Sequence, residues 1–242
     1  MQLSGQTAII TGGGSGIGLA IAQAFAAAGA AVVLAGRREA PLAAAAEGIR
    51  RSGGEALAIP ADVTAEDSIA ALFRAALAAR GRVDILVNNA GLFGGGPSDE
   101  VSLADWRAML EVNLTGAFIC SREALRAMKP RSSGRIINIG STAAKVPRAR
   151  SAAYAASKFG LDGLTRALAI EAREFGIGVS IIHPGNTVPG VWSGQEDKVR
   201  GEGLMDAGNV ARIALVMAGM PPDVLFYEGV VLPLNMPFLG RG

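Results

Sequence analysis

The sequence predicts an α/β fold: a doubly wound parallel sheet of about seven strands with helices on both faces. Short apolar runs alternate along the chain with longer, alanine-rich stretches of helical composition. Half of the 242 residues are apolar and only 5% are aromatic, which suits a core of small aliphatic side chains. Because the composition does not change along the chain, we expect one domain over residues 1–242.

The apolar runs have the length of buried strands, and the stretches between them have the length of helices. We expect strands at residues 7–10, 31–35, 56–60, 85–88, 135–139, 179–182 and 229–232. We expect helices at residues 16–28, 40–51, 65–80, 103–128, 153–175 and 209–217. This alternation implies parallel strands joined by right-handed crossovers. In such sheets, ligands bind at the carboxyl ends of the strands.

The first expected strand is followed by the glycine-rich run "TGGGSGIG" at residues 11–18. It is not a Walker loop, because no lysine follows the glycines in the required place. Gly12, Gly16 and Gly18 have the spacing Gly-x-x-x-Gly-x-Gly. A turn of this kind lets the backbone approach a pyrophosphate at the positive end of the next helix. A purely structural turn is the alternative.

The second expected strand ends in "AGRRE", where Gly36, Arg37 and Arg38 follow one another. At this position an acid would accept from a ribose 2′-hydroxyl, whereas arginine suits a 2′-phosphate. Glu39 comes where the next helix begins and suits the N-terminus of that helix. Arginines in a loop are ordinarily solvated, but their place at the ligand-binding edge favours a phosphate clamp.

The run "RIINIGS" at residues 135–141 is apolar, β-branched and closed by glycine, so we expect a strand that ends at Ser141. Thirteen residues later, "YAASK" places Tyr154 and Lys158 one turn apart on one face of a helix. A hydroxyl at a strand end would therefore face a phenol and an ammonium. An ordinary amphipathic helix with one interfacial tyrosine is the alternative.

Charge and composition exclude several classes of function. The net charge is +2 and the arginines are scattered, which disfavours a nucleic-acid or membrane surface. The single cysteine, Cys120, excludes an intrachain disulfide and fits a reducing compartment, so we expect a soluble cytoplasmic protein. The single histidine, His183, leaves a serine hydrolase without a base, and we expect it to be structural. One histidine and one cysteine do not build a zinc site of nitrogen and sulfur ligands, so we expect no metal.

Taken together, the motifs resemble those of the short-chain dehydrogenase/reductase family over essentially the whole chain. They are "TGGGSGIG", "ADV" at residues 61–63, "NNAG" at 88–91, "EVNL" with Asn113, "IGS" ending at Ser141, "YAASK" and "HPG" ending at Gly185. The resemblance implies a Rossmann-like fold, a nicotinamide cofactor and a small carbonyl or alcohol substrate. With Arg37 and Arg38 it favours NADP(H), although NAD(H) remains possible.

The resemblance also implies which residues form the site. The catalytic residues would be Asn113, Ser141, Tyr154 and Lys158. The cofactor would be bound by Thr11, Gly12, Gly14, Ser15, Gly16, Ile17, Gly18, Arg37, Arg38, Asp62, Val63, Asn89, Ala90, Gly91, Tyr154, Lys158, Pro184, Gly185 and Thr187. Asp62 and Val63 would hold the adenine, and Asn88, Ala90 and Gly91 would back the ribose.

The chemistry of hydride transfer accounts for these residue types. Tyr154 would be the acid in reduction and the base in oxidation. A free phenol titrates near ~10, so we expect two nearby positive charges, Lys158 and the oxidised nicotinamide ring, to lower the pKa of Tyr154. Ser141 would donate to the substrate oxygen, and Asn113 would hold a water that connects Lys158 to solvent.

Two departures from the family pattern concern the substrate end. Many relatives carry a threonine where this chain has Pro189, so either Thr187 replaces it or the loop follows another path. The chain also lacks the paired-glycine ending of the fatty-acid-synthesis reductases, which disfavours a 3-oxoacyl thioester as substrate. We expect residues 186–204, with Val188, Val191 and Trp192, to form a mobile lid, because they are glycine-rich and polar.

Two alternatives stay open at this point. One is a 3-oxoacyl thioester reductase, with Arg126, Lys129 and Arg131 docking an acidic carrier protein; a solvated helix end is the simpler account of these residues. The other is a nucleotide-binding regulator without catalysis. The resemblance further implies a homotetramer built through helices 103–128 and 153–175, with the apolar "LPLNMPFLG" near the C-terminus in a second interface.

Overall fold

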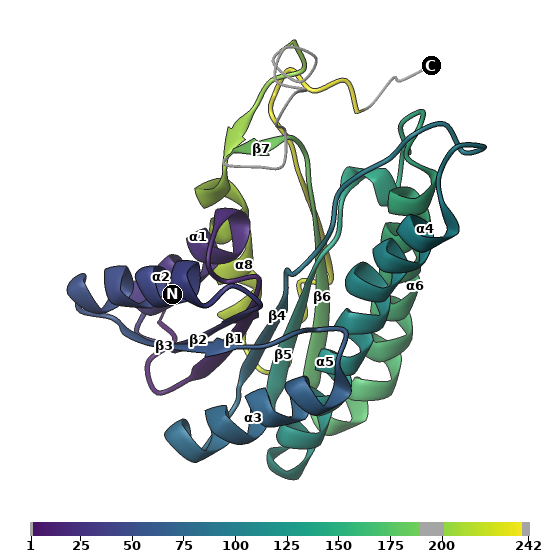
Figure 1. Cartoon of the computed structure of the whole chain (residues 1–242). Helices are drawn as coiled ribbons and strands as arrows, with labels where there is room; N and C mark the ends of the chain where they lie inside the picture. Colours follow the sequence, from purple (N-terminus) through teal and green to yellow (C-terminus); the bar gives the residue numbers. More distant parts are fainter. Residues whose placement is uncertain (1, 189–200, 239–242) are drawn as a thin grey trace.

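The structure is a computed structural model, and it describes residues 2–188 and 201–238. Its main sheet has seven parallel strands in the order β3-β2-β1-β4-β5-β6-β9 (Figure 1). The strands are β1 (Thr7–Thr11), β2 (Ala31–Gly36), β3 (Glu55–Pro60), β4 (Ile85–Asn88), β5 (Gly134–Ile139), β6 (Ile177–Pro184) and β9 (Glu228–Val231). The predicted doubly wound fold is confirmed.

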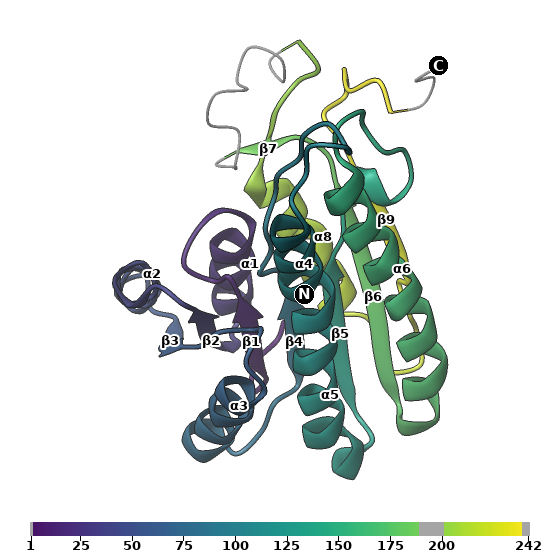
Figure 2. The same cartoon turned by 45° about the vertical axis from the view of Figure 1, so that its right-hand side comes forward.

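The helices cover both faces of this sheet, α1, α2 and α8 on one face and α3, α5 and α6 on the other (Figures 1 and 2). They are α1 (Gly16–Ala27), α2 (Glu39–Arg51), α3 (Glu66–Arg80), α4 (Leu103–Leu110), α5 (Gly116–Met128), α6 (Ala152–Ala172) and α8 (Ala207–Ala218). The short helical turns are η1 (Glu111–Thr115), η2 (Lys129–Arg131), η3 (Thr142–Ala144) and η4 (Arg173–Phe175). In the described part of the chain, none of the helices is both long enough and apolar enough to cross a membrane.

Each face of the sheet has its own hydrophobic core, because successive residues of a strand point to opposite faces. In β1, Ile10 packs with Phe25 of α1, whereas Ile9 packs with Phe73 of α3. Ile9, Ile10 and Phe25 are fully buried. The sheet is therefore covered on both sides, and the edge formed by the carboxyl ends of its strands remains for a ligand.

The strand order changes direction at β1, which pairs with β2 on one side and with β4 on the other. After β1 the chain enters α1 on one face of the sheet. After β4 it continues through α4 to α5 on the other face. This divergence opens a crevice at the carboxyl ends, where doubly wound sheets bind their ligands.

Two local features differ from the predicted elements. The helix expected over residues 103–128 is interrupted at η1, a single π-helical turn that contains Asn113. A second, two-stranded sheet joins β7 (Thr187–Val188) to β8 (Met205–Asp206). It ties together the two ends of the expected lid; residues 189–200, with Pro189, Val191 and Trp192, lie outside the described part of the chain.

Candidate active site

A cavity of about 870 Å³ lies over the carboxyl ends of the strands. It brings together most of the residues expected to bind the cofactor and the substrate. Those that line it are Gly12, Ser15, Gly16, Ile17, Arg37, Arg38, Asp62, Val63, Asn89, Ala90, Gly91, Ser141, Tyr154, Lys158, Pro184, Gly185 and Thr187. Thr11, Gly14, Gly18 and Asn113 are not among its lining residues.

The glycine-rich turn leads into α1 with little room for side chains. Gly12 has φ +65° and Gly16 has φ +55°, a region of backbone conformation that favours glycine. A Cβ atom on Gly18 would lie 2.4 Å from the carbonyl oxygen of Gly12, so Gly18 lets the helix approach the turn closely. Ser15, the N-cap of α1, makes no side-chain capping hydrogen bond. The positive end of α1 therefore faces the cavity with donors suited to a pyrophosphate.

Thr11 lies next to the cavity, outside its lining, and connects two strand ends. Its hydroxyl oxygen accepts from the backbone N–H groups of Asn89 and Ala90, each at 3.0 Å. The side chain of Asn89 donates in turn to the Thr11 carbonyl at 3.0 Å. These bonds join the ends of β1 and β4 and so fix the floor of the crevice. The amide of Asn88 points away to Ser121 and Asn138 and does not reach the cavity.

One end of the cavity is basic. Arg37 and Arg38 line it together with Asp62. The Asp62 carboxylate accepts from Thr64 N at 3.0 Å and from the Thr64 hydroxyl at 2.8 Å. The backbone bond from Thr64 is the main cause that lowers the pKa of Asp62, and the charge of Arg37 adds to it. The Asp62 carboxylate thus accepts its two hydrogen bonds from Thr64, two residues later in the chain. The guanidinium groups of Arg37 and Arg38 lie at the same end of the cavity, where they suit an anion.

The catalytic candidates meet at the other end, where α6 passes the end of β5. Lys158 is 6% exposed, and its ammonium donates to the carbonyl of Ile139 at 2.9 Å. Burial lowers the pKa of Lys158 to about 8. The Lys158 Nζ lies 5.8 Å from the centre of the Tyr154 ring. Phe93 packs edge-on against the same ring, with centroids 5.0 Å apart.

The expectation that Lys158 lowers the pKa of Tyr154 is wrong for the protein without its cofactor. Burial raises the pKa of Tyr154 above its ordinary value of 10.0, and the hydrogen bond with the Ser141 side chain only partly opposes this effect. Removing the phenol from water disfavours the phenolate, and the Lys158 ammonium is bound to the Ile139 carbonyl rather than to the phenol oxygen. Tyr154 is therefore protonated at neutral pH.

Ser141 lies just beyond the end of β5, where it caps the short turn η3. Its Oγ accepts from the N–H of Ala143 at 3.1 Å. That bond leaves the hydroxyl hydrogen available for donation to another oxygen. The hydroxyl groups of Ser141 and Tyr154 thus lie within hydrogen-bonding distance of each other in the lining of the cavity.

Asn113 acts through the backbone beside the cavity. Its Oδ1 accepts from Leu92 N at 2.7 Å, and its Nδ2 donates to Leu92 O at 2.9 Å and to Ser157 Oγ at 3.0 Å. The π-helical turn points this amide at the segment after β4, and π-turns of this kind are frequent at functional sites. The expected water relay stays a prediction, because these bonds engage the amide with protein groups.

The sequence profile of the family described as "short chain dehydrogenase" matches residues 6–199. The chain belongs to the short-chain dehydrogenase/reductase family. It is 41% identical over 181 residues to a cis-4-hydroxycyclohexanecarboxylate dehydrogenase of Sinomonas cyclohexanicum, covering 74% of this chain and 72% of that protein. It is 40% identical over 185 residues to a 3-oxoacyl-[acyl-carrier-protein] reductase of Synechocystis, covering 76% and 74%.

Solved structures agree with this assignment. A metagenomic short-chain oxidoreductase in complex with NADP superposes with a TM-score of 0.84 at 37% identity, covering 96% of this chain and 98% of that one. A short-chain dehydrogenase/reductase mutant from Serratia marcescens superposes with a TM-score of 0.87 at 33% identity, covering 97% and 99%. As a short-chain dehydrogenase/reductase, the chain is an oxidoreductase of a family that uses nicotinamide cofactors.

This short-chain dehydrogenase/reductase also has cavity residues that no motif indicated. They are Arg148, Ala149 and Arg150, which line the cavity together with Asn186 of the expected lid. Arg148 donates to Asn186 at 3.1 Å and is ion-paired with Glu202. These residues come from loops, where neither periodicity nor spacing marks a residue as functional.

Proposed function

We propose that this protein transfers a hydride between NADP(H) and a carbonyl or secondary alcohol substrate, with Tyr154 as general acid or base. One observation carries the proposal: Ser141, Tyr154 and Lys158 meet at one end of the same cavity that has Arg37 and Arg38 at its other end. A dinucleotide laid across the glycine-rich turn would place its nicotinamide among the first three residues and a 2′-phosphate beside the arginines.

The nicotinamide, when bound, supplies or accepts the hydride. The chain supplies the groups that manage charge on the substrate oxygen. In the reducing direction, negative charge develops on that oxygen, where Ser141 and Tyr154 can both donate hydrogen bonds. The raised pKa of Tyr154 keeps its proton available at neutral pH for transfer to the oxygen. Lys158 contributes a buried positive charge beside the phenol.

Cofactor preference follows from the basic end of the cavity. A guanidinium group suits a 2′-phosphate because it offers several donors in one plane. Gly36 lies at this end and carries no carboxylate that would accept from a 2′-hydroxyl or repel a phosphate. We therefore propose NADP(H) as the preferred cofactor, and Thr187, which lines the cavity, as the hydroxyl that takes the place of the threonine replaced by Pro189.

A 3-oxoacyl thioester is the second candidate for the substrate, because the Synechocystis relative acts on that class by its name. The basic residues that could dock a carrier protein have partners within the chain. Arg126 pairs with Glu123 at 2.6 Å, and Lys129 lies 4.0 Å over the ring of Phe175. Arg131 pairs with Asp84. We favour a small carbonyl compound for this reason.

The experiment that tests the function follows NADPH oxidation across ketones, aldehydes, quinones and 3-oxoacyl thioesters. Turnover of at least one carbonyl compound, lost in Tyr154→Phe, is the expected result. NADPH binding without turnover of any of them would instead favour the nucleotide-binding regulator.

We also propose a homotetramer in the cytoplasm, acting as one domain with a substrate lid at residues 186–204. Apolar side chains on α4, α5 and α6 support the assembly: Leu103 is 60% exposed, Phe118 44%, Phe159 47% and Ile170 66%. Near the C-terminus, Leu234 is 99% exposed. For the cytoplasmic location, the support is that a single cysteine, Cys120, fits a reducing compartment.

A further inference from the structure

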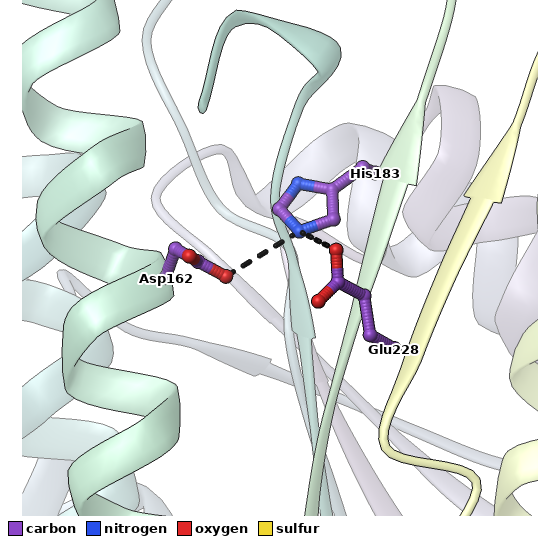
Figure 3. Close-up of side chains that lie close together, drawn as sticks. All are labelled: Asp162, His183 and Glu228. Atoms are coloured by element: carbon purple, nitrogen blue, oxygen red, sulfur yellow. Dashed lines mark ion pairs between the residues drawn. The ribbon is translucent and has the colours of Figure 1, made fainter. Parts of the chain in front are cut away.

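A cluster of charged side chains lies next to Ser141 but outside the lining of the cavity. The imidazole of His183 on β6 points between Asp162 on α6 and Glu228 on β9 (Figure 3). Its Nε2 lies 3.6 Å from Asp162 Oδ1 and 3.6 Å from Glu228 Oε1. His183 is fully buried, and within the described residues its Nε2 makes no hydrogen bond, because both carboxylate oxygens stay at 3.6 Å.

The other nitrogen of the ring faces the backbone of Ser141. His183 Nδ1 lies 2.9 Å from the Ser141 carbonyl oxygen and 3.3 Å from the Ser141 nitrogen. A Cβ atom on Gly140 would come within 2.7 Å of this Nδ1, so the glycine is what lets the ring lie against the backbone. Burial lowers the pKa of His183 below its ordinary value of 6.5, so the ring is neutral at pH 7.

The two carboxylates have cationic partners of their own. Lys145 Nζ lies 2.8 Å from Glu228 Oε1 and 3.4 Å from Asp162 Oδ2. Arg166 lies 3.2 Å from Asp162 Oδ2. One histidine and two carboxylates could also bind a divalent cation. Here the two cationic side chains already balance the charge, and a metal would have to displace the Lys145 ammonium.

The cluster connects the segments that carry the catalytic candidates. Asp162 follows Lys158 by one helical turn and Tyr154 by two, on the same face of α6. Lys145 follows Ser141 by four residues, directly after η3. The ring of His183 therefore lies between the Ser141 backbone and two carboxylates, one of which belongs to the helix that carries Tyr154.

We propose that His183 is a positioning residue for Ser141: its Nδ1 holds the Ser141 backbone, while Asp162 and Glu228 flank the opposite side of the ring and limit its rotation. The proposal rests on the proposed function, in which Ser141 donates to the substrate oxygen. A displacement of the Ser141 hydroxyl by a fraction of an ångström would weaken that hydrogen bond in the transition state.

Asparagine and glutamine separate the two roles of the ring. The terminal amide of asparagine takes the place of Nδ1, whereas that of glutamine takes the place of Nε2. His183→Asn keeps a polar partner for the Ser141 backbone, and we expect it to keep kcat within about threefold of the wild type. His183→Gln loses that partner, and we expect kcat to fall about tenfold with the NADPH dissociation constant unchanged.

A double-mutant cycle distinguishes positioning from a general loss of structure. In the Ser141→Ala background there is no hydroxyl to position, so His183→Gln should lower kcat no further. Glu228→Gln, on an edge strand, is the milder variant if His183→Gln does not fold. We expect it to lower kcat about threefold in the wild type and not in Ser141→Ala. Ser180→Ala, on the same strand as His183, is the matched control and should leave kcat unchanged.

Three outcomes would overturn the proposal. If Ser141→Ala keeps full activity with a substrate that the wild type turns over, the proposed function of Ser141 is wrong and the positioning role falls with it. If Ser141→Ala is impaired but His183→Asn and His183→Gln have equal kcat, or the loss in His183→Gln persists in the double mutant, only the positioning role is wrong. Loss of wild-type activity on chelation, restored by a divalent metal in the wild type but not in Glu228→Gln, would show that the cluster is a metal site.

Discussion

Lys158 Nζ donates to the carbonyl oxygen of Ile139 at 2.9 Å, which binds the middle of α6 to the end of β5. The two residues belong to segments that are adjacent in space and separated by a loop and η3 along the chain. Through this bond the helix with Tyr154 is held against the strand end that leads to Ser141. The ammonium that makes the bond is buried, and this has a cost in stability that depends on pH.

Replacing Lys158 by methionine should stabilise the protein at neutral pH. The folded-state pKa of Lys158 is about 8, against an ordinary value of 10.5. Below pH 8 the lysine is charged in both states, and the folded state carries the full burial penalty, on the order of 3 kcal/mol. As the pH rises from 8 to 10.5, the unfolded state holds the proton that the folded state has lost, so the wild type gains stability relative to the variant. Urea unfolding at pH 7 and pH 10 measures both effects, and a constant difference between the two proteins would contradict the prediction.

Replacing Tyr154 by phenylalanine should abolish turnover, by at least about a hundredfold in kcat, because it removes the hydroxyl proposed to exchange the proton with the substrate oxygen. The NADPH dissociation constant should stay nearly unchanged, since the glycine-rich turn and the arginines proposed to bind the cofactor are not altered. Single-turnover kinetics and fluorescence titration with NADPH check the two statements. Substantial residual turnover would remove Tyr154 from its proposed role.

Replacing Arg37 by alanine should weaken NADPH binding about tenfold and leave NADH binding nearly unchanged, because only NADPH has the 2′-phosphate. Gly36→Asp should shift the preference toward NADH. The structure has room for this change, since a Cβ atom on Gly36 would meet only Leu42, at 3.7 Å. Comparing kcat/KM for both cofactors at low and high salt tests the clamp. A wild type that prefers NADH at low salt would show that the arginines serve another purpose.

Gly18→Ala and Gly48→Ala should have opposite effects on stability. A Cβ atom on Gly18 would lie 2.4 Å from Gly12 O, a backbone atom that has nowhere to move, so the free energy of unfolding and the NADPH affinity should both fall. Gly48 lies inside α2 with nothing near its Cβ position, and alanine there should stabilise by up to about 1 kcal/mol. Thermal unfolding with and without NADPH distinguishes them. Equal effects would mean that the turn is not tightly packed.

The assembly is tested by light scattering at micromolar concentration, where we expect the mass of four 24.6 kDa chains. Phe118→Asp and Phe159→Asp place charges on α5 and α6, the face proposed to pack against its symmetry mate, and should lower that mass. A wild-type mass of one chain would contradict the tetramer.

The residue pattern was sufficient to predict the elements, because burial on both faces of a parallel sheet requires apolar strands that differ in length and composition from the helices between them. In the main sheet, β4 has the predicted limits and the other six strands differ from theirs by at most two residues at either end, whereas the short strands β7 and β8 were not predicted. The motifs also predicted that the site lies at the carboxyl ends of the strands. Each motif residue follows a strand or lies on the next helix, and the cavity is lined by Gly12, Arg37, Ser141 and Lys158. Periodicity and spacing are local properties, and these features are local consequences of them.

The pKa of the buried phenol and the contacts between residues far apart in the sequence depended on the tertiary structure. The spacing of Tyr154 and Lys158 predicted a lowered phenol pKa, but burial raises it, because desolvation depends on what covers the ring and not on the spacing of two residues. The amide of Asn113, in the π-turn, is bonded to Leu92, which lies 21 residues earlier in the chain, and periodicity does not predict a contact of this range. His183 lies 42 residues from Ser141 along the chain, and pairing of β5 with β6 brings the two together. A contact of this range is decided by which strands become neighbours, and that choice belongs to the whole sheet.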